Sequence, residues 1–193
     1  LLFAEDSEAL SQKGVIRKLY DPACGTGGML SEAEKYLKEL NEHAHLEVYG
    51  QELNGESFGI CKSDMMIKGQ NPKNIKYGNS FSEDGLKEER FDYMLSNPPF
   101  GVEWRKVEKQ IKDEAGDLGF GGRFGAGLPR VSDGSLLFVQ HMISKMNFQN
   151  MGSGQPSRIA VILNNSSLSN GGPGSGESEI RRWIIENDWL EAI

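Results

Sequence analysis

Three glycines in four positions, Gly25, Gly27 and Gly28, follow an apolar run and the dipeptide Asp21-Pro22 in the stretch DPACGTGG. Glycine accepts positive backbone φ angles and lets a ligand approach the backbone closely, because it has no Cβ atom. If a helix begins here, its first N–H groups are free to bind a negatively charged group. The stretch therefore predicts a ligand-binding turn between a strand and a helix. A tight turn without a ligand is the alternative that this motif alone leaves open.

A carboxylate at the end of the next predicted strand supports ligand binding. Glu52 ends the run LEVYGQE, 24 residues after Gly28. An acidic side chain at this place can accept hydrogen bonds from both ribose hydroxyls of a bound nucleoside. Leu30 stands where the dinucleotide fingerprint has Gly or Ala, which argues against NAD. Together the two features predict an adenosine-type cofactor, although a solvated carboxylate would explain Glu52 taken alone.

A second short motif, NPPF at 97–100, follows another predicted strand. Pro98 restricts Asn97 to an extended conformation, so the amide projects in a fixed direction. The Asn97 side-chain oxygen and the Pro98 carbonyl would accept from both N–H groups of an exocyclic amine. They would thereby stabilise the positive charge that develops when the amine attacks a methyl group. Phe100 would stack on a base that has left its helix. A turn that merely ends the strand is the alternative.

Strand and helix patterns alternate along the chain and position both motifs. Apolar, β-rich runs predict strands at 15–20, 46–52, 74–79, 91–97 and 158–164, and WLEAI (189–193) begins another. The run at 158–164 predicts a strand buried on both faces. Apolar residues at helical spacing predict helices at 29–43, 56–69, 134–147 and 178–187. This alternation is typical of an α/β fold with a mostly parallel, twisted sheet and helices on both faces. Both motifs then lie beyond the carboxyl ends of strands, where such sheets bind ligands.

Composition limits the remaining possibilities. A chain of 193 residues with a net charge of −7 has the size of one large domain, and its charge argues against nucleic-acid binding over the whole surface. A local basic groove remains compatible with that charge. The two cysteines cannot form a disulfide framework, so we expect a reducing cytoplasm. The few cysteines and histidines supply too few ligands for zinc, and we expect no metal.

DPACGTGG together with NPPF resembles the amino-group DNA methyltransferases, most closely the M (modification) subunit of type I restriction–modification systems. The octapeptide is highly specific for this group, whereas NPPF is shared with other amine methyltransferases. Further segments are similar to the family: GQELN (50–54), YGNSF (77–81), DGSLLFVQHMI (133–143) and RIAVILNNSSLSNGG (158–172). The resemblance implies a Rossmann-like class I fold dependent on S-adenosylmethionine (SAM). It also implies methyl transfer to the exocyclic amine of a flipped adenine in duplex DNA.

The resemblance also implies site residues. The methionine part of SAM would be held by Asp21, Pro22, Ala23, Cys24, Gly25, Thr26, Gly27 and Gly28, and its ribose by Glu52. The turn Asn79, Ser80 and Phe81 would contact the cofactor adenine. The family often has Asp at position 79, but an amide oxygen can still accept a hydrogen bond. Asn97, Pro98, Pro99 and Phe100 would form the catalytic clamp on the target adenine.

Strand–helix units fill residues 29–96 between the two motifs and leave no room for a target-recognition domain. DNA specificity would therefore come from further C-terminal sequence or from a separate subunit. The resemblance implies the latter, a specificity subunit, together with a restriction subunit and two modification subunits per complex. No run approaches eighteen consecutive apolar residues, so we expect no membrane span. The resemblance also implies a helical N-terminal region and a further cofactor-binding segment before Leu1. We interpret 1–193 as a catalytic domain truncated at both ends, with a C-terminal remainder absent, and expect the fragment alone to be inactive.

The connection at 101–133 interrupts the alternation of strands and helices. It has glycines at positions 116, 119, 121, 122, 125 and 127 and few apolar residues at periodic spacing. A loop of this length in a compact domain is typically a lid, a binding loop or disordered. Its position after NPPF favours a lid that DNA orders, while its nearly balanced charges leave a solvated loop as the alternative.

Other functions remain open at this point. The same chemistry could act on an RNA base or a protein glutamine, which the octapeptide argues against. An inactive SAM-binding assembly module is a third possibility, although an intact NPPF opposes it. An NAD-dependent oxidoreductase is the weakest alternative.

Overall fold

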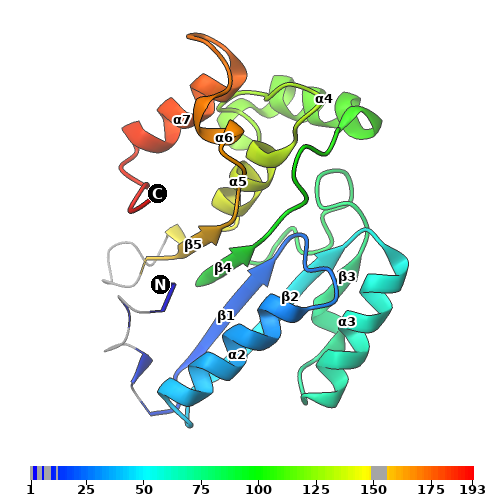
Figure 1. Cartoon of the computed structure of the whole chain (residues 1–193), viewed down its shortest axis with the longest axis vertical. Coiled ribbons are helices and arrows are strands. Elements are labelled where there is room, and N and C mark those ends of the chain that lie inside the picture. The colour runs from blue at the N-terminus through cyan, green and yellow to red at the C-terminus, as the bar shows by residue number, and fades with distance from the viewer. Residues whose placement is uncertain (1, 4–5, 7–9, 12, 149–155) are drawn as a thin grey trace. The chain divides into compact units, whose positions relative to one another are not determined.

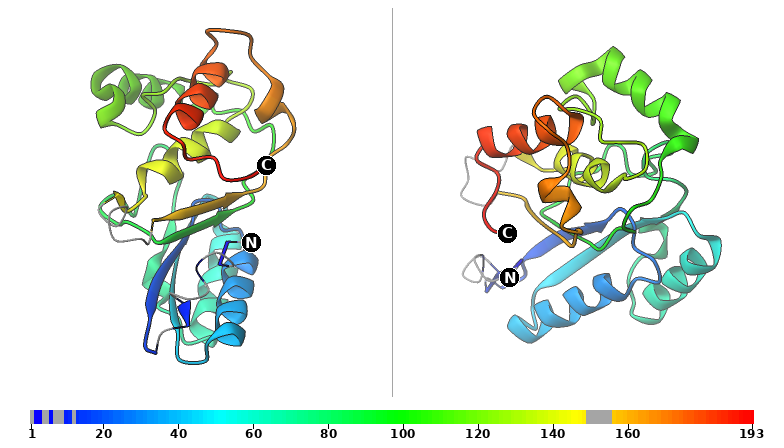
Figure 2. Two further views of the ribbon diagram at one scale, coloured as in Figure 1. Left: turned by 90° about the vertical axis from the view of Figure 1, so that its left-hand side faces the viewer. Right: turned by 45° about the horizontal axis from the view of Figure 1, so that its top comes forward.

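The computed structural model describes residues 2–3, 6, 10–11, 13–148 and 156–193. Its sheet has five parallel strands in the order β3-β2-β1-β4-β5 (Figure 1). The strands are β1 (Ile16–Asp21), β2 (His45–Glu52), β3 (Ile75–Tyr77), β4 (Tyr93–Ser96) and β5 (Arg158–Val161). Figure 2 shows β1 and β2 running side by side in the same direction. The predicted α/β class with a parallel sheet is thus confirmed.

Helices connect the strands. They are α2 (Gly28–Leu40), α3 (Gly55–Ile67), α4 (Glu108–Leu118), α5 (Ser135–Ser144), α6 (Ser166–Ser169) and α7 (Gly176–Glu186). Short 3-10 turns lie at Pro72–Asn74, Arg105–Val107 and Gly119–Gly121. The four helices expected from apolar spacing correspond to α2, α3, α5 and α7. None of the helices in the described part of the chain is long and apolar enough to cross a membrane.

The chain divides into two compact units. Unit 1 comprises Leu1–Asn97 and Lys145–Val161, and unit 2 comprises Pro98–Ser144 and Ile162–Ile193. Unit 1 therefore contains the whole sheet with α2 and α3, whereas unit 2 contains α4 to α7. The boundary falls inside NPPF, between Asn97 and Pro98.

The core of unit 1 explains why these elements form. On α2, Leu30, Ala33 and Leu37 recur at helical spacing and are buried against strand residues such as Leu19 and Leu46. α3 joins the same cluster through its buried residues Cys61 and Met65, so both helices cover one face of the sheet. Strand residues of the opposite face, among them Tyr20 and Tyr49, pack on Phe91 with ring centroids 4.5 and 5.2 Å away.

The strand predicted at 158–164 is present as β5, but its predicted end and its burial on both faces were wrong, and so was the strand predicted at WLEAI. β5 ends at Val161 and is half-buried, because it pairs only with β4 and lies at the edge of the described sheet. Ile162, which was expected to continue a buried strand, is 51% exposed. The terminal WLEAI does not form a strand, and residues 190–193 are exposed. Trp189 instead packs edge-to-face on Trp183, with ring centroids 4.9 Å apart.

The segment 101–133 is not an irregular loop, since it contains α4. Of the residues of α4, Ile111 is the buried apolar one, so the periodic signal was too weak to predict a helix. Glu114 on this helix holds the chain that follows, accepting hydrogen bonds from Arg123 N at 2.8 Å and Arg123 Nε at 2.9 Å. Whether this segment acts as a lid stays a prediction.

Candidate active site

The predicted site segments of unit 1 follow four adjacent strands. Asp21 ends β1 and the turn to Gly28 follows it, Glu52 ends β2, Asn79–Phe81 begin two residues after β3, and Asn97 follows β4. Because the strands are parallel and neighbours in the order β3-β2-β1-β4, these segments gather along one edge of the sheet (Figure 1). The structure thus brings together residues that are up to 76 positions apart in the sequence (97 − 21).

The glycine turn has the backbone that its sequence predicts. Gly25 and Gly27 have φ angles of 55° and 87°, in the region that favours glycine. A Cβ atom on Gly27 would lie 2.8 Å from the Cys61 Sγ of α3, so the turn also approaches that helix closely. Gly27 precedes α2 and offers no side chain to cap it. The first amides of α2 are therefore suited to bind a negatively charged group.

A side chain at the end of β4 and one from the loop after β3 hold the turn. Asp21 Oδ1 accepts hydrogen bonds from Ser96 Oγ at 2.6 Å and from Ala23 N at 2.9 Å. The carbonyl of Pro22 accepts from Ser80 Oγ at 2.6 Å. Asp21, Ser80 and Ser96 are buried, so these bonds are protected from water.

The end of β2 holds the other half of the turn. Cys24 N donates to the Gln51 carbonyl at 3.1 Å, and Gly25 N donates to Glu52 Oε2 at 2.8 Å. Glu52 Oε1 accepts from Asn54 N at 2.7 Å. Each carboxylate oxygen has lone pairs beyond the one used here, and Glu52 is only half-buried. The carboxylate is therefore suited to accept from two hydroxyl groups of a ligand.

The loop after β3 exposes little of the three residues predicted to contact the cofactor adenine. Asn79 is half-buried, and its Oδ1 accepts from Phe81 N at 2.9 Å. Ser80 and Phe81 are buried at 6% and 7% exposure. The predicted contact of Asn79–Phe81 with an adenine stays untested, and of these three residues Asn79 has the most accessible side chain.

NPPF begins at the end of β4 and passes from unit 1 into unit 2. Asn97 is exposed, directly after the fully buried Ser96. Pro98 is buried, Pro99 is exposed, and the Phe100 ring is 50% exposed. An exposed amide and an exposed aromatic ring are the groups that the predicted clamp requires.

A family model decides the classification of the chain. Residues 8–193 match the model described as N-6 DNA Methylase, which is nearly the whole sequence. The chain belongs to the N-6 DNA Methylase family. This result confirms the resemblance inferred from DPACGTGG and NPPF.

Individual relatives of this family member are similar in sequence and fold. The chain is 29% identical over 177 residues to the type I restriction enzyme MjaIX methylase subunit of Methanocaldococcus jannaschii, with coverage of 91% of this chain and 29% of that subunit. It is 24% identical over 200 residues to the MpnII methylase subunit of Mycoplasma pneumoniae, with coverage of 96% and 33%. The chain thus spans about a third of these relatives.

Solved structures confirm the methyltransferase fold. The type I restriction-modification system methyltransferase subunit of Streptococcus thermophilus superposes with a TM-score of 0.70 at 23% identity, over 96% of this chain and 36% of that one. The M protein of the type I restriction enzyme EcoKI gives a TM-score of 0.61 at 22% identity, over 93% and 35%.

Electrostatics distinguish Asp21 within this family member's turn. Burial raises the pKa of Asp21 to about 6, and the Glu52 charge adds to this, while the hydrogen bonds from Ser96 and Ala23 oppose it. Asp21 is therefore ionised at neutral pH and gains a proton in mild acid. A cation bound beside it would favour the ionised form.

Cys24 packs against Cys61 behind the turn. Its Sγ lies 3.9 Å from the Cys61 Sγ, and both thiols are buried. The hydrogen bond with Cys61 and burial raise the pKa of the Cys24 thiol. In the described residues no group of three or more His, Cys, Asp and Glu side chains is arranged to hold a metal ion.

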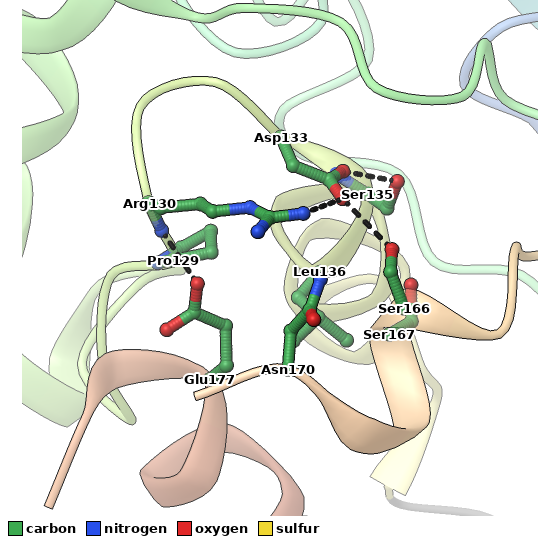
Figure 3. Close-up of a pocket in the computed structure, with 9 residues that line it drawn as sticks. All are labelled: Pro129, Arg130, Asp133, Ser135, Leu136, Ser166, Ser167, Asn170 and Glu177. Carbon is green, nitrogen blue, oxygen red and sulfur yellow. Dashed lines mark hydrogen bonds and ion pairs between the residues drawn. The ribbon is translucent and has the colours of Figure 1, made fainter. Parts of the chain in front are cut away.

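A small pocket in unit 2 is structural (Figure 3). It is lined by Pro129, Arg130, Asp133, Ser135, Leu136, Ser166, Ser167, Asn170 and Glu177, and its volume of about 10 Å³ has room for one water molecule. Its polar groups bind one another: Asp133 accepts from Ser135 and Ser166, and Arg130 N donates to Glu177 Oε1 at 2.9 Å. This cluster joins α5, α6 and α7 and has no room for a nucleoside.

Sequence reasoning missed several residues of the site. Ser96 and Gln51 bind the turn, and the fully buried Gln51 side chain also holds the loop after β3 through Glu83 O at 2.7 Å and Gly85 N at 3.1 Å. Leu53 and Tyr77 are each 61% exposed at the ends of β2 and β3. An apolar residue directly after a strand-end acid is a signal that could have identified Leu53.

Proposed function

We propose that this chain is the catalytic part of a modification subunit that methylates the exocyclic amine of a flipped adenine in duplex DNA, using SAM. The supporting observation is that the glycine turn, Glu52 and Asn97 lie at the ends of adjacent parallel strands. Membership of the N-6 DNA Methylase family supports an N6 amine in DNA as the acceptor, and similarity to type I methylase subunits of Methanocaldococcus and Mycoplasma supports the role of a modification subunit.

SAM supplies the methyl group when it is bound. In the proposal, the uncapped first turn of α2 binds its carboxylate, and the Asp21 carboxylate binds its ammonium group. Glu52 accepts hydrogen bonds from the ribose hydroxyls. Leu53 supplies apolar surface for the adenine ring and Asn79 a polar contact, while the other residues of Asp21–Gly28 shape the turn.

The acceptor side depends on NPPF. The Asn97 side-chain oxygen and the Pro98 carbonyl accept hydrogen bonds from the two N–H groups of the target amine. They would stabilise the positive charge on nitrogen as the bond to the methyl carbon forms and the bond between that carbon and the sulfonium sulfur of SAM breaks, which leaves S-adenosylhomocysteine as the neutral leaving group; the proton then leaves to solvent. Pro99 keeps this segment rigid, and the half-exposed Phe100 stacks on the flipped base.

The segment 101–133 is proposed to close over DNA. Its exposed lysines Lys106, Lys109 and Lys112 on and before α4 would contact phosphates. Glu108 reduces this contribution, because it pairs with Lys112 at 2.7 Å. We therefore expect the segment to add modestly to DNA affinity.

The proposed complex contains two modification subunits, a specificity subunit and a restriction subunit, and acts in the cytoplasm. The naming of the relatives as methylase subunits of type I restriction enzymes supports this assembly. The specificity subunit would select the DNA sequence.

The test is a methyl-transfer assay with the full-length chain and its specificity subunit. Tritiated SAM is supplied with genomic DNA, total RNA or unfolded protein, and DNA is digested and analysed for N6-methyladenine. Label in N6-methyladenine is the expected result. Label only in RNA or protein would move the chain to another amine acceptor, and no transfer to any of the three would refute the proposal.

A further inference from the structure

At the carboxyl ends of the strands, where the site lies, β1 and β4 are paired over a shorter length than the other neighbouring strands. β1 pairs with β2 as far as Asp21 and Gly50, and β4 pairs with β5 as far as Ser96 and Val161. The pairing between β1 and β4 ends earlier, at Tyr20 and Met94. The ends of β1 and β4 are therefore hydrogen-bonded to β2 and β5 respectively. Between β1 and β4 themselves, the described backbone pairing stops before these ends.

One side-chain hydrogen bond continues the connection beyond that point. Ser96 Oγ donates to Asp21 Oδ1 at 2.6 Å, and the two residues are 0% and 2% exposed. Asp21 opens the turn assigned to the methyl donor, and Ser96 directly precedes Asn97, which is assigned to the acceptor. The bond thus joins the two halves of the proposed reaction across the central strand pair.

We propose that Ser96 is a positioning residue, whose hydrogen bond to Asp21 fixes the distance between the cofactor turn and Asn97. The inference rests on the proposed function and extends it to a residue outside both motifs. Because methyl transfer requires the two reacting atoms in line and in contact, a small displacement of Asn97 relative to the turn lowers the rate.

The surroundings of Asp21 make this bond measurable. The titratable groups that interact electrostatically with Asp21 are Glu52 from β2, Cys61 from α3, and Tyr20 and Cys24 from its own segment. None of them is a cation, so the charge of Asp21 relies on hydrogen-bond donors, of which Ser96 is one. Removal of the Ser96 hydroxyl should therefore raise the pH at which Asp21 gains a proton.

The experiment compares Ser96→Ala with Ser96→Thr in the full-length chain bound to its specificity subunit, measuring kcat and KM for SAM between pH 5 and 9. In Ser96→Ala we expect kcat/KM to fall about tenfold at pH 7.5, as for loss of one hydrogen bond to a charged group. The acid limb of the profile should move to higher pH by about one unit. Ser96→Thr keeps the hydroxyl, so its kcat/KM and the position of its acid limb should both lie near the wild-type values.

If Ser96→Ala does not fold, Ser96→Cys is used in its place, because the thiol keeps the shape of the side chain but is a weak hydrogen-bond donor.

Ser157→Ala is the matched control for stability. Ser157 is buried at 7% exposure and donates to the Phe91 carbonyl at 2.7 Å, just before β5 begins. Its loss should lower the melting temperature without moving the acid limb or KM. The inference is overturned if Ser96→Ala keeps the wild-type profile, or if its acid limb stays unmoved and it loses only stability, as expected for Ser157→Ala. Absence of methylation by the wild-type complex would instead refute the proposed function, and the positioning role with it.

Discussion

Asp21 in unit 1 and Asp133 in unit 2 are buried carboxylates, each of which accepts a hydrogen bond of 2.6 Å from a serine hydroxyl. The pKa values of the two carboxyls are nevertheless shifted in opposite directions from the ordinary value. Burial raises the pKa of Asp21 to about 6, against an ordinary value of 3.8. Burial acts on Asp133 in the same direction, but hydrogen bonds from Ser135 and Ser166 hold the pKa of Asp133 below 3.8.

The number and charge of the partners explain the difference. Asp133 accepts from Ser135 N at 3.1 Å as well as from Ser135 Oγ and Ser166 Oγ, and the Arg130 guanidinium lies 3.5 Å from it. Asp21 has the two donors Ser96 and Ala23, and the nearby charge of Glu52 is of the same sign. The negative charge of Asp133 is therefore stabilised by partners within the protein, which is typical of a structural carboxylate. Asp21 has fewer such partners, so a cationic ligand would stabilise its charge.

The largest expected loss of activity comes from a substitution of Asn97, the residue after Ser96. Asn97→Ala removes one acceptor for the target amine, so methylation should fall about 10³-fold. SAM affinity should stay near wild type, because Asn97 makes no contact with the turn in the proposal. Single-turnover kinetics and calorimetry measure the two quantities, and an active variant would contradict the clamp.

Asp21→Asn should separate stability from function. Ionisation of Asp21 costs the folded state free energy, since its folded pKa lies above its unfolded one. Its contribution to stability therefore falls as the pH rises from about 4 to about 6. An uncharged Asn should stabilise the fold at pH 7 by up to about 3 kcal/mol, from 6 − 3.8 pH units, while methylation falls about 100-fold.

Denaturant unfolding of wild type and Asp21→Asn at pH 4 and pH 7 measures this effect. The stabilisation should nearly disappear at pH 4, where the wild-type carboxyl is already protonated in the folded state. A variant that is less stable at pH 7 than wild type would show that Asp21 is a structural carboxylate like Asp133.

Asp133→Asn should have the opposite sign at neutral pH. The folded pKa of Asp133 is lowered, so its charge contributes stability above about 3.8 that is lost as the pH falls through the folded pKa. Loss of its charge-assisted bonds should destabilise the chain by about 2 kcal/mol at pH 7. The same unfolding series tests this, and SAM affinity below the melting transition should be unchanged; a large loss of affinity would place Asp133 in the site.

The smallest effect concerns Cys24 and Cys61, which lie behind the turn. Both are buried, which keeps reagents away from them. The hydrogen bond between them raises the pKa of the Cys24 thiol and lowers the pKa of the Cys61 thiol, so burial is what protects Cys61. Peptide mapping after alkylation should find both thiols nearly unmodified in the native protein and fully modified in denaturant. Rapid native labelling of Cys24 would mean that the turn opens readily.

Much of the fold followed from local patterns. Continuous β-rich runs predicted β1 to β5, and apolar helical spacing predicted the helices α2, α3, α5 and α7. In unit 1, β1 to β4, α2 and α3 each bury a face in one core, which is why their patterns were readable. α4 was missed because Ile111 is its one buried residue and six of its eleven residues are charged, so it has no apolar stripe. The run at 158–164 misled because apolar composition does not reveal that β5 lies at the edge of the described sheet.

The sequence alone determined the glycine turn, because positive φ angles at Gly25 and Gly27 are a local property of residue type. It also determined the family, through two motifs whose residue types the chemistry requires. Only the tertiary structure decided which residues hold those motifs in place. Ser96 and Asp21 are 75 residues apart, and they meet because the parallel strands β1 and β4 are neighbours in the sheet. A single serine in the sequence does not indicate such a contact. The proton affinity of Asp21 was likewise beyond sequence, because it depends on burial and on the donors and charges that folding brings near.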